Sequence, residues 1–144
     1  MAKTLSVAIK EFTKELEGVR DSLTSAYQNT LYDVGNTLVY YTPIDTGYAS
    51  SNWNVSSGDR VESEREPEKG IKGAASLLAI QKQVKGLEKE PFALFYNPVD
   101  YIGDLNGDNG PPTSRQAPTG ITVPTTSKIQ DIWEMNLTKF NIKK

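Results

Sequence analysis

The triplet Asp45-Thr46-Gly47 contains the residues of this chain that are most suggestive of catalysis. The same triplet occurs in aspartic proteases, where dimerisation brings two carboxylates together to share a proton and activate water. That chemistry expects an apolar strand before the aspartate. Here Pro43 stands two residues before it and follows a segment with the helix period. We therefore favour a turn with a positive-φ glycine, and keep a dimeric aspartic protease using Asp45 as the alternative function.

A second acidic segment, residues 104–108, has the spacing that begins an EF-hand calcium loop. The sixth position of such a loop should be glycine and is Asn109. The twelfth should be glutamate and is Arg115, whose charge would repel the ion. A polar turn is favoured over a looser calcium site, so the sequence predicts neither a metal nor another cofactor.

The composition excludes most other catalytic mechanisms. The 144 residues include no Cys and no His, which excludes thiolate and imidazole ligands and any hydrolase with a histidine base. The net charge of -2 gives no basic surface for gripping phosphates. No apolar run approaches the ~18 residues of a membrane span, and the first residues do not resemble a signal peptide. We therefore expect a non-enzymatic protein made in a cytoplasm, without a membrane partner.

A long N-terminal helix is expected to position the segments that follow it. Apolar residues recur at steps of three or four from Leu5 to Leu38, with no proline between them. This pattern predicts a helix over residues 3–41, about 50 Å long at ~1.5 Å per residue. A domain of this size is only ~30 Å across. Either the helix breaks near Asn29 or Gly35, or one end projects and offers an apolar stripe to a partner.

The next segment is expected to turn and then form a strand. The helix should end at Thr42, because the residue before a proline disfavours the helical backbone. From Ala49 to Ser56 the residue types alternate, which predicts a half-buried strand with Trp53 on its buried side. The solvent side of this strand is predicted to carry Ser50, Asn52, Asn54 and Ser56.

The remaining pattern predicts an α+β fold. A middle helix covers residues 77–87, and the apolar residues 92–96 suit an interior strand that 99–102 extends or pairs with. A closing helix runs from about Thr125 to Asn141. Its predicted buried face carries Ile129, Ile132, Trp133, Leu137 and Phe140.

Two segments are predicted to contain neither helix nor strand: a solvated, mobile charged connection at 58–72 and a long loop at 103–120. Residues 1–144 are thus expected to form a single domain. It consists of a small antiparallel sheet packed by a long N-terminal helix, a middle helix and a C-terminal helix.

Three motifs follow one another along the chain. Residues 42–47 are Thr-Pro-Ile-Asp-Thr-Gly, residues 95–102 are Phe-Tyr-Asn-Pro-Val-Asp-Tyr-Ile, and residues 114–123 are Ser-Arg-Gln-Ala-Pro-Thr-Gly-Ile-Thr-Val. Together they resemble the neck and tail-completion proteins of long-tailed bacteriophages, a family that includes the minor tail protein Z type. Those proteins commonly contain Thr-Pro-Val-Asp-Thr-Gly, Asn-Asn-Leu-Pro-Tyr and Gln-Ala-Pro-x-Gly-Met-Val, in this order.

The resemblance implies a structural virion protein of the head–tail junction. Such subunits form a ring homo-oligomer between the capsid connector and the tail-tube or tail-terminator proteins, and DNA passes through the ring without sequence-specific binding. The residues that the resemblance marks as structural or interface candidates are Pro43, Asp45, Thr46, Gly47, Trp53, Tyr101, Gln116, Ala117, Pro118 and Gly120. A third function, a helical interaction module built on a coiled coil, is disfavoured because charges do not flank the apolar stripe regularly.

Overall fold

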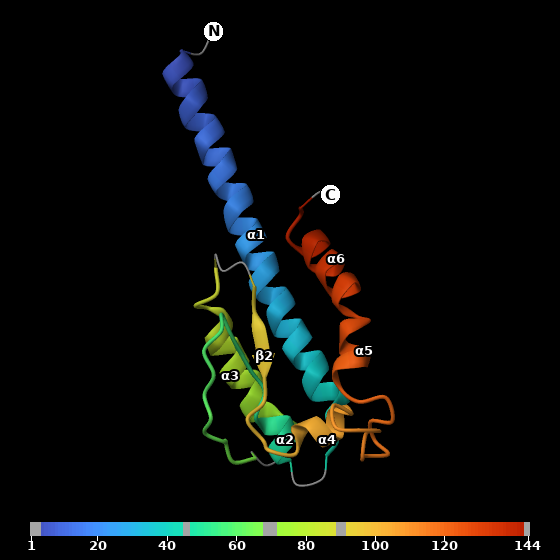
Figure 1. The fold of residues 1–144 in the computed structure, drawn as a ribbon. Helices are drawn as coiled ribbons and strands as arrows, with labels where there is room; N and C mark the ends of the chain where they lie inside the picture. Colours follow the sequence, from blue (N-terminus) through green and yellow to red (C-terminus); the bar gives the residue numbers. More distant parts are fainter. Residues whose placement is uncertain (1–3, 45–46, 68–71, 89–91, 143–144) are drawn as a thin grey trace.

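The computed structural model describes residues 4–44, 47–67, 72–88 and 92–142. It confirms the predicted α+β class, with helices around a small antiparallel sheet (Figure 1). The elements in chain order are α1 (Leu5–Tyr41), α2 (Tyr48–Ser51), β1 (Asn54–Ser56), α3 (Ala74–Val84), β2 (Leu94–Tyr96), α4 (Ile102–Asn106), α5 (Thr122–Thr126) and α6 (Ile129–Lys139).

Helix α1 is continuous over 37 residues, about 55 Å. Its first turn is capped by Thr4, whose hydroxyl oxygen accepts a hydrogen bond from the Val7 amide at 3.4 Å. The helix breaks at neither of the two positions that the sequence suggested. Of the two predicted possibilities, the structure therefore has the projecting end: the first half of α1 rises beyond the other elements (Figure 1).

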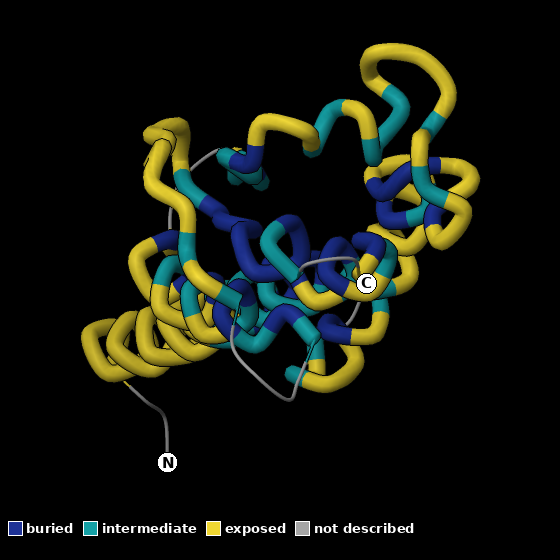
Figure 2. The backbone as a smooth tube through the Cα atoms, turned by 90° about the horizontal axis from the view of Figure 1, so that it is seen from below, coloured by how far each residue is buried: buried dark blue, intermediate teal, exposed yellow. Residues whose placement is uncertain are grey.

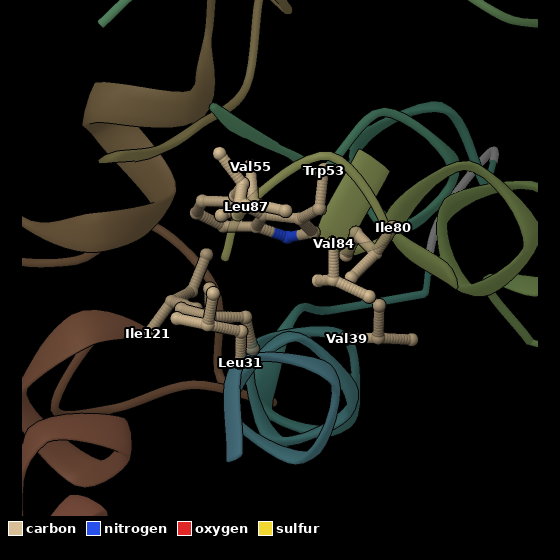
Figure 3. Close-up of a cluster of buried hydrophobic side chains, with 9 residues drawn as sticks. Leu31, Val39, Trp53, Val55, Ile80, Val84, Leu87 and Ile121 are labelled. Atoms are coloured by element: carbon tan, nitrogen blue, oxygen red, sulfur yellow. The ribbon is translucent and has the colours of Figure 1, made fainter. Parts of the chain in front are cut away.

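The sheet has two antiparallel strands, β1 and β2, with Val55 paired to Phe95. The core lies between this sheet, α3 and the second half of α1, and Figure 3 shows its side chains converging around Trp53. Its buried members are Leu31, Leu38, Val39, Trp53, Val55, Ile80, Val84, Leu87 and Ile121. Helix α6 packs on the other side of α1 and runs antiparallel to it (Figure 1).

The end of α1 is tied to the core by a hydroxyl group. The Thr42 hydroxyl donates a hydrogen bond to the Leu38 carbonyl at 2.6 Å and accepts one from the Trp53 indole N–H at 2.8 Å. Thr42 and Trp53 are both buried, so these bonds satisfy polar atoms that water does not reach. Pro43 then prevents the helix from continuing.

The predicted strand at 49–56 is wrong in its first half. Gly47, at φ 85°, turns the chain into the single helical turn α2, and the strand begins only at Asn54. The polar residues expected to face solvent are mostly inside: Ser50, Asn52 and Asn54 are each at most 1% exposed. Burial is possible because their polar atoms have partners within the protein.

Two predictions for the middle of the chain are also wrong. Phe92, expected in an interior strand, is 58% exposed, and β2 begins at Leu94. Residues 99–102 do not extend the sheet; a turn there leads into α4. Part of the predicted loop at 103–120 is therefore helical, because the Leu105 amide donates to the Tyr101 carbonyl and closes the first turn.

The closing helix is divided in two. α5 begins at Thr122, three residues before the predicted start, and Pro124 lies in its first turn. The chain turns at Ser127 and Lys128 before α6 continues to Lys139. On the predicted buried face only Leu137 is buried, at 9% exposure, while Ile129 is 41% exposed. A residue not predicted to be buried, Asn136, lies beside Leu137 at 2% exposure.

The charged connection contains neither helix nor strand in its described parts, 58–67 and Lys72, and most of its side chains are exposed as predicted. Its predicted mobility stays a prediction. Arg65 attaches it to the chain before β1: the guanidinium donates to the carbonyls of Ser51 and Trp53 at 2.9 and 2.6 Å, and to Asn54 Oδ1 at 2.8 Å. The Arg65 amide and carbonyl both bind the Asn52 side chain.

Candidate assembly interface

The most exposed apolar feature of the described chain is one face of the projecting half of α1. We call it the α1 stripe. Its side chains are 40–77% exposed and comprise Leu5, Ile9, Phe12, Leu16, Val19 and Leu23. Seen from below, this half of the helix is exposed turn after turn, whereas the second half enters the buried centre (Figure 2). A helix whose apolar face meets water needs a partner to cover that face.

The second half of α1 shows what the stripe would gain from a partner. Leu31, Val34 and Leu38 continue the apolar pattern and are 3–7% exposed, packed against the fold. Complete burial of one such side chain stabilises by roughly 1.5–3 kcal/mol. The same helix therefore has one half covered by its own domain and one half available for association.

The structure brings the three sequence motifs together below α1. The Gln116 side chain forms two hydrogen bonds with the backbone of Ile44: its Oε1 accepts from the Ile44 amide at 2.8 Å, and its Nε2 donates to the Ile44 carbonyl at 3.0 Å. A pocket of about 360 Å³ beside this bridge is lined by Pro43, Gly47 and Tyr101, among others. Residues from all three motifs thus meet around one bridge.

The other motif residues have structural positions. Trp53 and Ala117 are buried, and Pro118 is exposed on the turn that follows. Gly120, at φ 82°, lies so close to α4 that an added Cβ would be 2.3 Å from the Asn106 carbonyl oxygen. Asp45 and Thr46 lie outside the described residues, so the geometry of the protease triplet is not described.

The acidic segment at 104–108 uses its side chains internally. Asn106 Nδ2 donates to Asp108 Oδ1 at 2.8 Å, and Asn109 Nδ2 donates to Asp104 Oδ1 at 3.2 Å. Asn106 Oδ1 accepts from the amides of Ile121 and Thr122, joining α4 to α5. Across the described residues, no three His, Cys, Asp or Glu side chains are grouped so that they could hold a metal ion.

Asn136 provides a polar connection between α6 and α1 that sequence reasoning missed. Its Nδ2 lies within hydrogen-bond distance of Thr30 Oγ1 and Asp33 Oδ2, at 3.1 and 3.0 Å, and its Oδ1 accepts from the Asn29 side chain. The signal was present in the sequence, since Asn136 falls between Trp133 and Leu137 on the predicted apolar face. Buried amides of this kind fix how two helices pack.

An open groove of about 890 Å³ lies next to this connection, between α1 and α6. Its lining mixes amides and charges with exposed apolar groups, such as Tyr40 and Met135, which are 74% and 72% exposed. No two carboxylates line it, and its charged members are Asp33, Lys128 and Lys139. The groove suits contact with another surface better than acid–base chemistry.

Two groups with shifted pKa values hold the 58–67 segment. A hydrogen bond of 2.7 Å to Glu66, together with the charge of that carboxylate, raises the pKa of Tyr48. Burial lowers the pKa of Arg65, whose guanidinium is bound by neutral oxygens of Ser51, Trp53 and Asn54. Both groups form hydrogen bonds that hold the 58–67 segment in place, so their role is structural.

No protein-family model, curated protein or solved structure matches this chain. Of the helices in the described ranges, none combines the length and the apolar character that a membrane span requires. The α1 stripe, rather than a cluster of reactive groups, is therefore the feature from which a function is best argued.

Proposed function

We propose that this chain is a structural subunit of a bacteriophage head–tail junction, a neck or tail-completion protein that acts by packing against neighbouring subunits. The observation that carries the proposal is the α1 stripe, whose apolar side chains are 40–77% exposed on a projecting helix. An exposed apolar face of this kind marks a contact surface, which an assembly protein buries on joining its partners.

The three motifs support the proposal in a second way. They resemble those of neck and tail-completion proteins, and in this structure they surround the bridge between Gln116 and Ile44. This bridge fixes the chain where it leaves α1, at the point where the motifs meet. The angle of the projecting helix is held by the second half of α1, which packs against the core.

A ring of such subunits uses heterologous contacts, in which one surface of each subunit meets a different surface of the next. In our proposal the α1 stripe and the 103–120 segment provide contacts to ring neighbours, to the capsid connector and to the tail-tube or tail-terminator proteins. The net charge of -2 suits a ring that lets DNA pass without binding it. The location that follows is the virion, with assembly in the host cytoplasm.

Electron microscopy of particles from a phage that lacks only this chain tests the proposal. Full heads and finished tails lying apart are the expected result, and supplying the chain in trans should restore joined particles. Normal virions formed without the chain would refute the proposal. The alternative, a dimeric aspartic protease, requires a pepstatin-sensitive cleavage activity that Asp45→Asn abolishes.

A further inference from the structure

The α1 stripe has a regular spacing that goes beyond general amphipathicity. From Leu5 to Leu23 its members are separated by steps of four, three, four, three and four residues. This is the heptad spacing with which two helices pack side by side. The same steps continue to Ala26 and Thr30, which are 0% and 8% exposed.

Helix α6 covers this continuation. Asn136 of α6 reaches Thr30 and the position that follows it in this spacing, Asp33. The second half of α1 is therefore covered, by α6 at Thr30 and Asp33 and by the core at Leu31 and Leu38, whereas the apolar side chains of the first half are exposed. Helix α6 is antiparallel to α1 and lies beside its second half, while the first half of α1 projects beyond the other elements (Figure 1).

The exposed stripe is large enough to form an interface. Six apolar side chains, each about half exposed, present on the order of 600 Å² of apolar surface. Two such faces brought together, with their flanking residues, approach the ~1,200 Å² that a specific interface buries. A second copy of this chain supplies a face of matching length and identical spacing.

We propose that the first halves of α1 from two copies pair antiparallel, each covering the stripe of the other. In a parallel pair, the second half of the partner's helix would run onto the face that α6 already occupies. In an antiparallel pair, the partner's domain lies at the N-terminal end of α1 instead, the end that projects away from the other elements (Figure 1).

The heptad spacing fixes the register of this pair. Maximum overlap places Leu5 opposite Leu23 of the second copy, Ile9 opposite Val19, and Phe12 opposite Leu16. The interface is two-fold symmetric, with its axis between Phe12 and Leu16. The six side chains of each stripe are then all buried in layers, as in the interior of an antiparallel helix pair.

The flanking charges distinguish the two orientations. In the antiparallel register, Glu15 lies near Glu15 of the second copy, so these like charges repel. In a parallel register, Glu15 would instead lie near Arg20 of the second copy and attract it. The proposal therefore expects Glu15→Gln, or added salt, to tighten the dimer a few-fold, because both reduce the repulsion. A weaker dimer under either condition would overturn it.

The absence of cysteine from the chain permits a direct test by cross-linking. Under mild oxidation, the double variant Ile9→Cys/Val19→Cys should form a disulfide-linked dimer, since these positions face each other between copies. Ile9→Cys alone should not, because the two copies of this position are ~15 Å apart in the antiparallel register, beyond the reach of a disulfide. Efficient cross-linking of Ile9→Cys alone would show a parallel pair and refute the proposal.

Sedimentation velocity of the unmodified chain provides the second measurement. A concentration-dependent dimer is expected, and a monomer throughout the micromolar range would overturn the proposal. Leu16→Glu should abolish the dimer while leaving the circular dichroism and melting of the domain intact, since Leu16 is 53% exposed and lies outside the core. The matched control is Lys10→Glu, which changes a charge away from the stripe and should leave the dimer unchanged.

This pairing does not depend on the proposed function. It concerns the free chain, and it would keep the stripe covered before other partners replace the second copy. Normal virions formed without this chain would refute the proposed virion role but not the proposed pairing. A free chain that stays monomeric would refute the proposed pairing but not the proposed virion role.

Discussion

Gly35 of α1 lies directly against Ile80 of α3. A Cβ built on Gly35 would be 2.7 Å from Ile80 Cδ1 and 3.2 Å from Ile80 Cγ2, while Ile80 itself is 0% exposed. The glycine therefore has a packing role: it lets α3 approach α1 closely enough to close the core. This contact explains why a residue that weakens helices lies inside a continuous helix.

Gly35→Ala is expected to destabilise the domain by about 1 kcal/mol. Overpacking a core costs roughly 1–3 kcal/mol, which exceeds the ~1 kcal/mol that alanine contributes through helix propensity. Urea unfolding measures the difference. Adding Ile80→Val removes Cδ1 and should make the double variant more stable than the sum of the two single effects.

The matched control for this substitution is Gly18→Ala. A Cβ at Gly18 meets no atom within 4 Å, so only helix propensity changes. This variant should be neutral or more stable by up to ~1 kcal/mol. Equal effects of the two alanine substitutions would contradict the packing role of Gly35.

Arg65→Met should destabilise the domain by about 2 kcal/mol, as expected for the loss of hydrogen bonds from a charged donor. The guanidinium donates to three oxygens before and within β1, and Met retains most of the apolar stem. The corresponding control is Arg60→Met on the exposed part of the same segment. If both variants unfold at the same urea concentration, Arg65 does not anchor the segment.

Asn136→Leu should cost about 1–3 kcal/mol, because it leaves polar atoms at the α1–α6 contact without their partner. The atoms concerned belong to Thr30 and Asp33, which the Asn136 amide reaches at 3.1 and 3.0 Å. Thermal unfolding checks this. Asn36→Leu changes the same residue type at an exposed position of α1 and should have a much smaller effect.

Gln116→Ala should loosen the exit from α1 more than it lowers global stability. Gln116 is exposed, so its loss is expected to cost about 1 kcal/mol or less. Hydrogen exchange is the sensitive measurement, because the Ile44 amide loses its acceptor and should exchange faster. Unchanged protection at Ile44 would mean that the bridge does not hold this turn.

Glu66→Gln should lower the pKa of Tyr48 toward its usual value of 10.0, because the hydrogen bond to the Glu66 carboxylate is the main cause of the upward shift. A raised pKa of the folded state contributes stability that is present below pH 10 and lost as the pH rises through the shifted value. NMR titration of labelled tyrosine measures the shift. Glu62→Gln removes a charge from the same segment and should leave the Tyr48 titration unchanged.

The helices could be predicted from sequence where the apolar period is long. The pattern from Leu5 to Leu38 predicted α1 to within two residues at its start, because helix periodicity is a local property of the chain. The same pattern did not show which half is covered by the domain. That depends on where the sheet, α3 and α6 pack against α1, and all of these elements lie later in the chain.

The polar interior could not be predicted. Asn52 and Asn54 alternate with apolar residues, which locally indicates a solvent-facing side. They are buried because Arg65, more than ten residues away, supplies their partners. The candidate site had the same difficulty: its motifs were recognisable in sequence, but the bridge joining Gln116 to Ile44 spans 72 residues. Contacts at such distances arise from the tertiary fold.

Because α1 is uninterrupted, its projecting half is rigidly connected to the half that packs in the core. No proline lies between Leu5 and Tyr41, and Gly35 packs directly against Ile80. A force on the N-terminal end of α1 is therefore transmitted along the helix to Thr42, whose hydroxyl accepts a hydrogen bond from the Trp53 indole. Because Trp133 also emits, the fluorescence of Trp53 in a Trp133→Phe variant would report on strain at this contact.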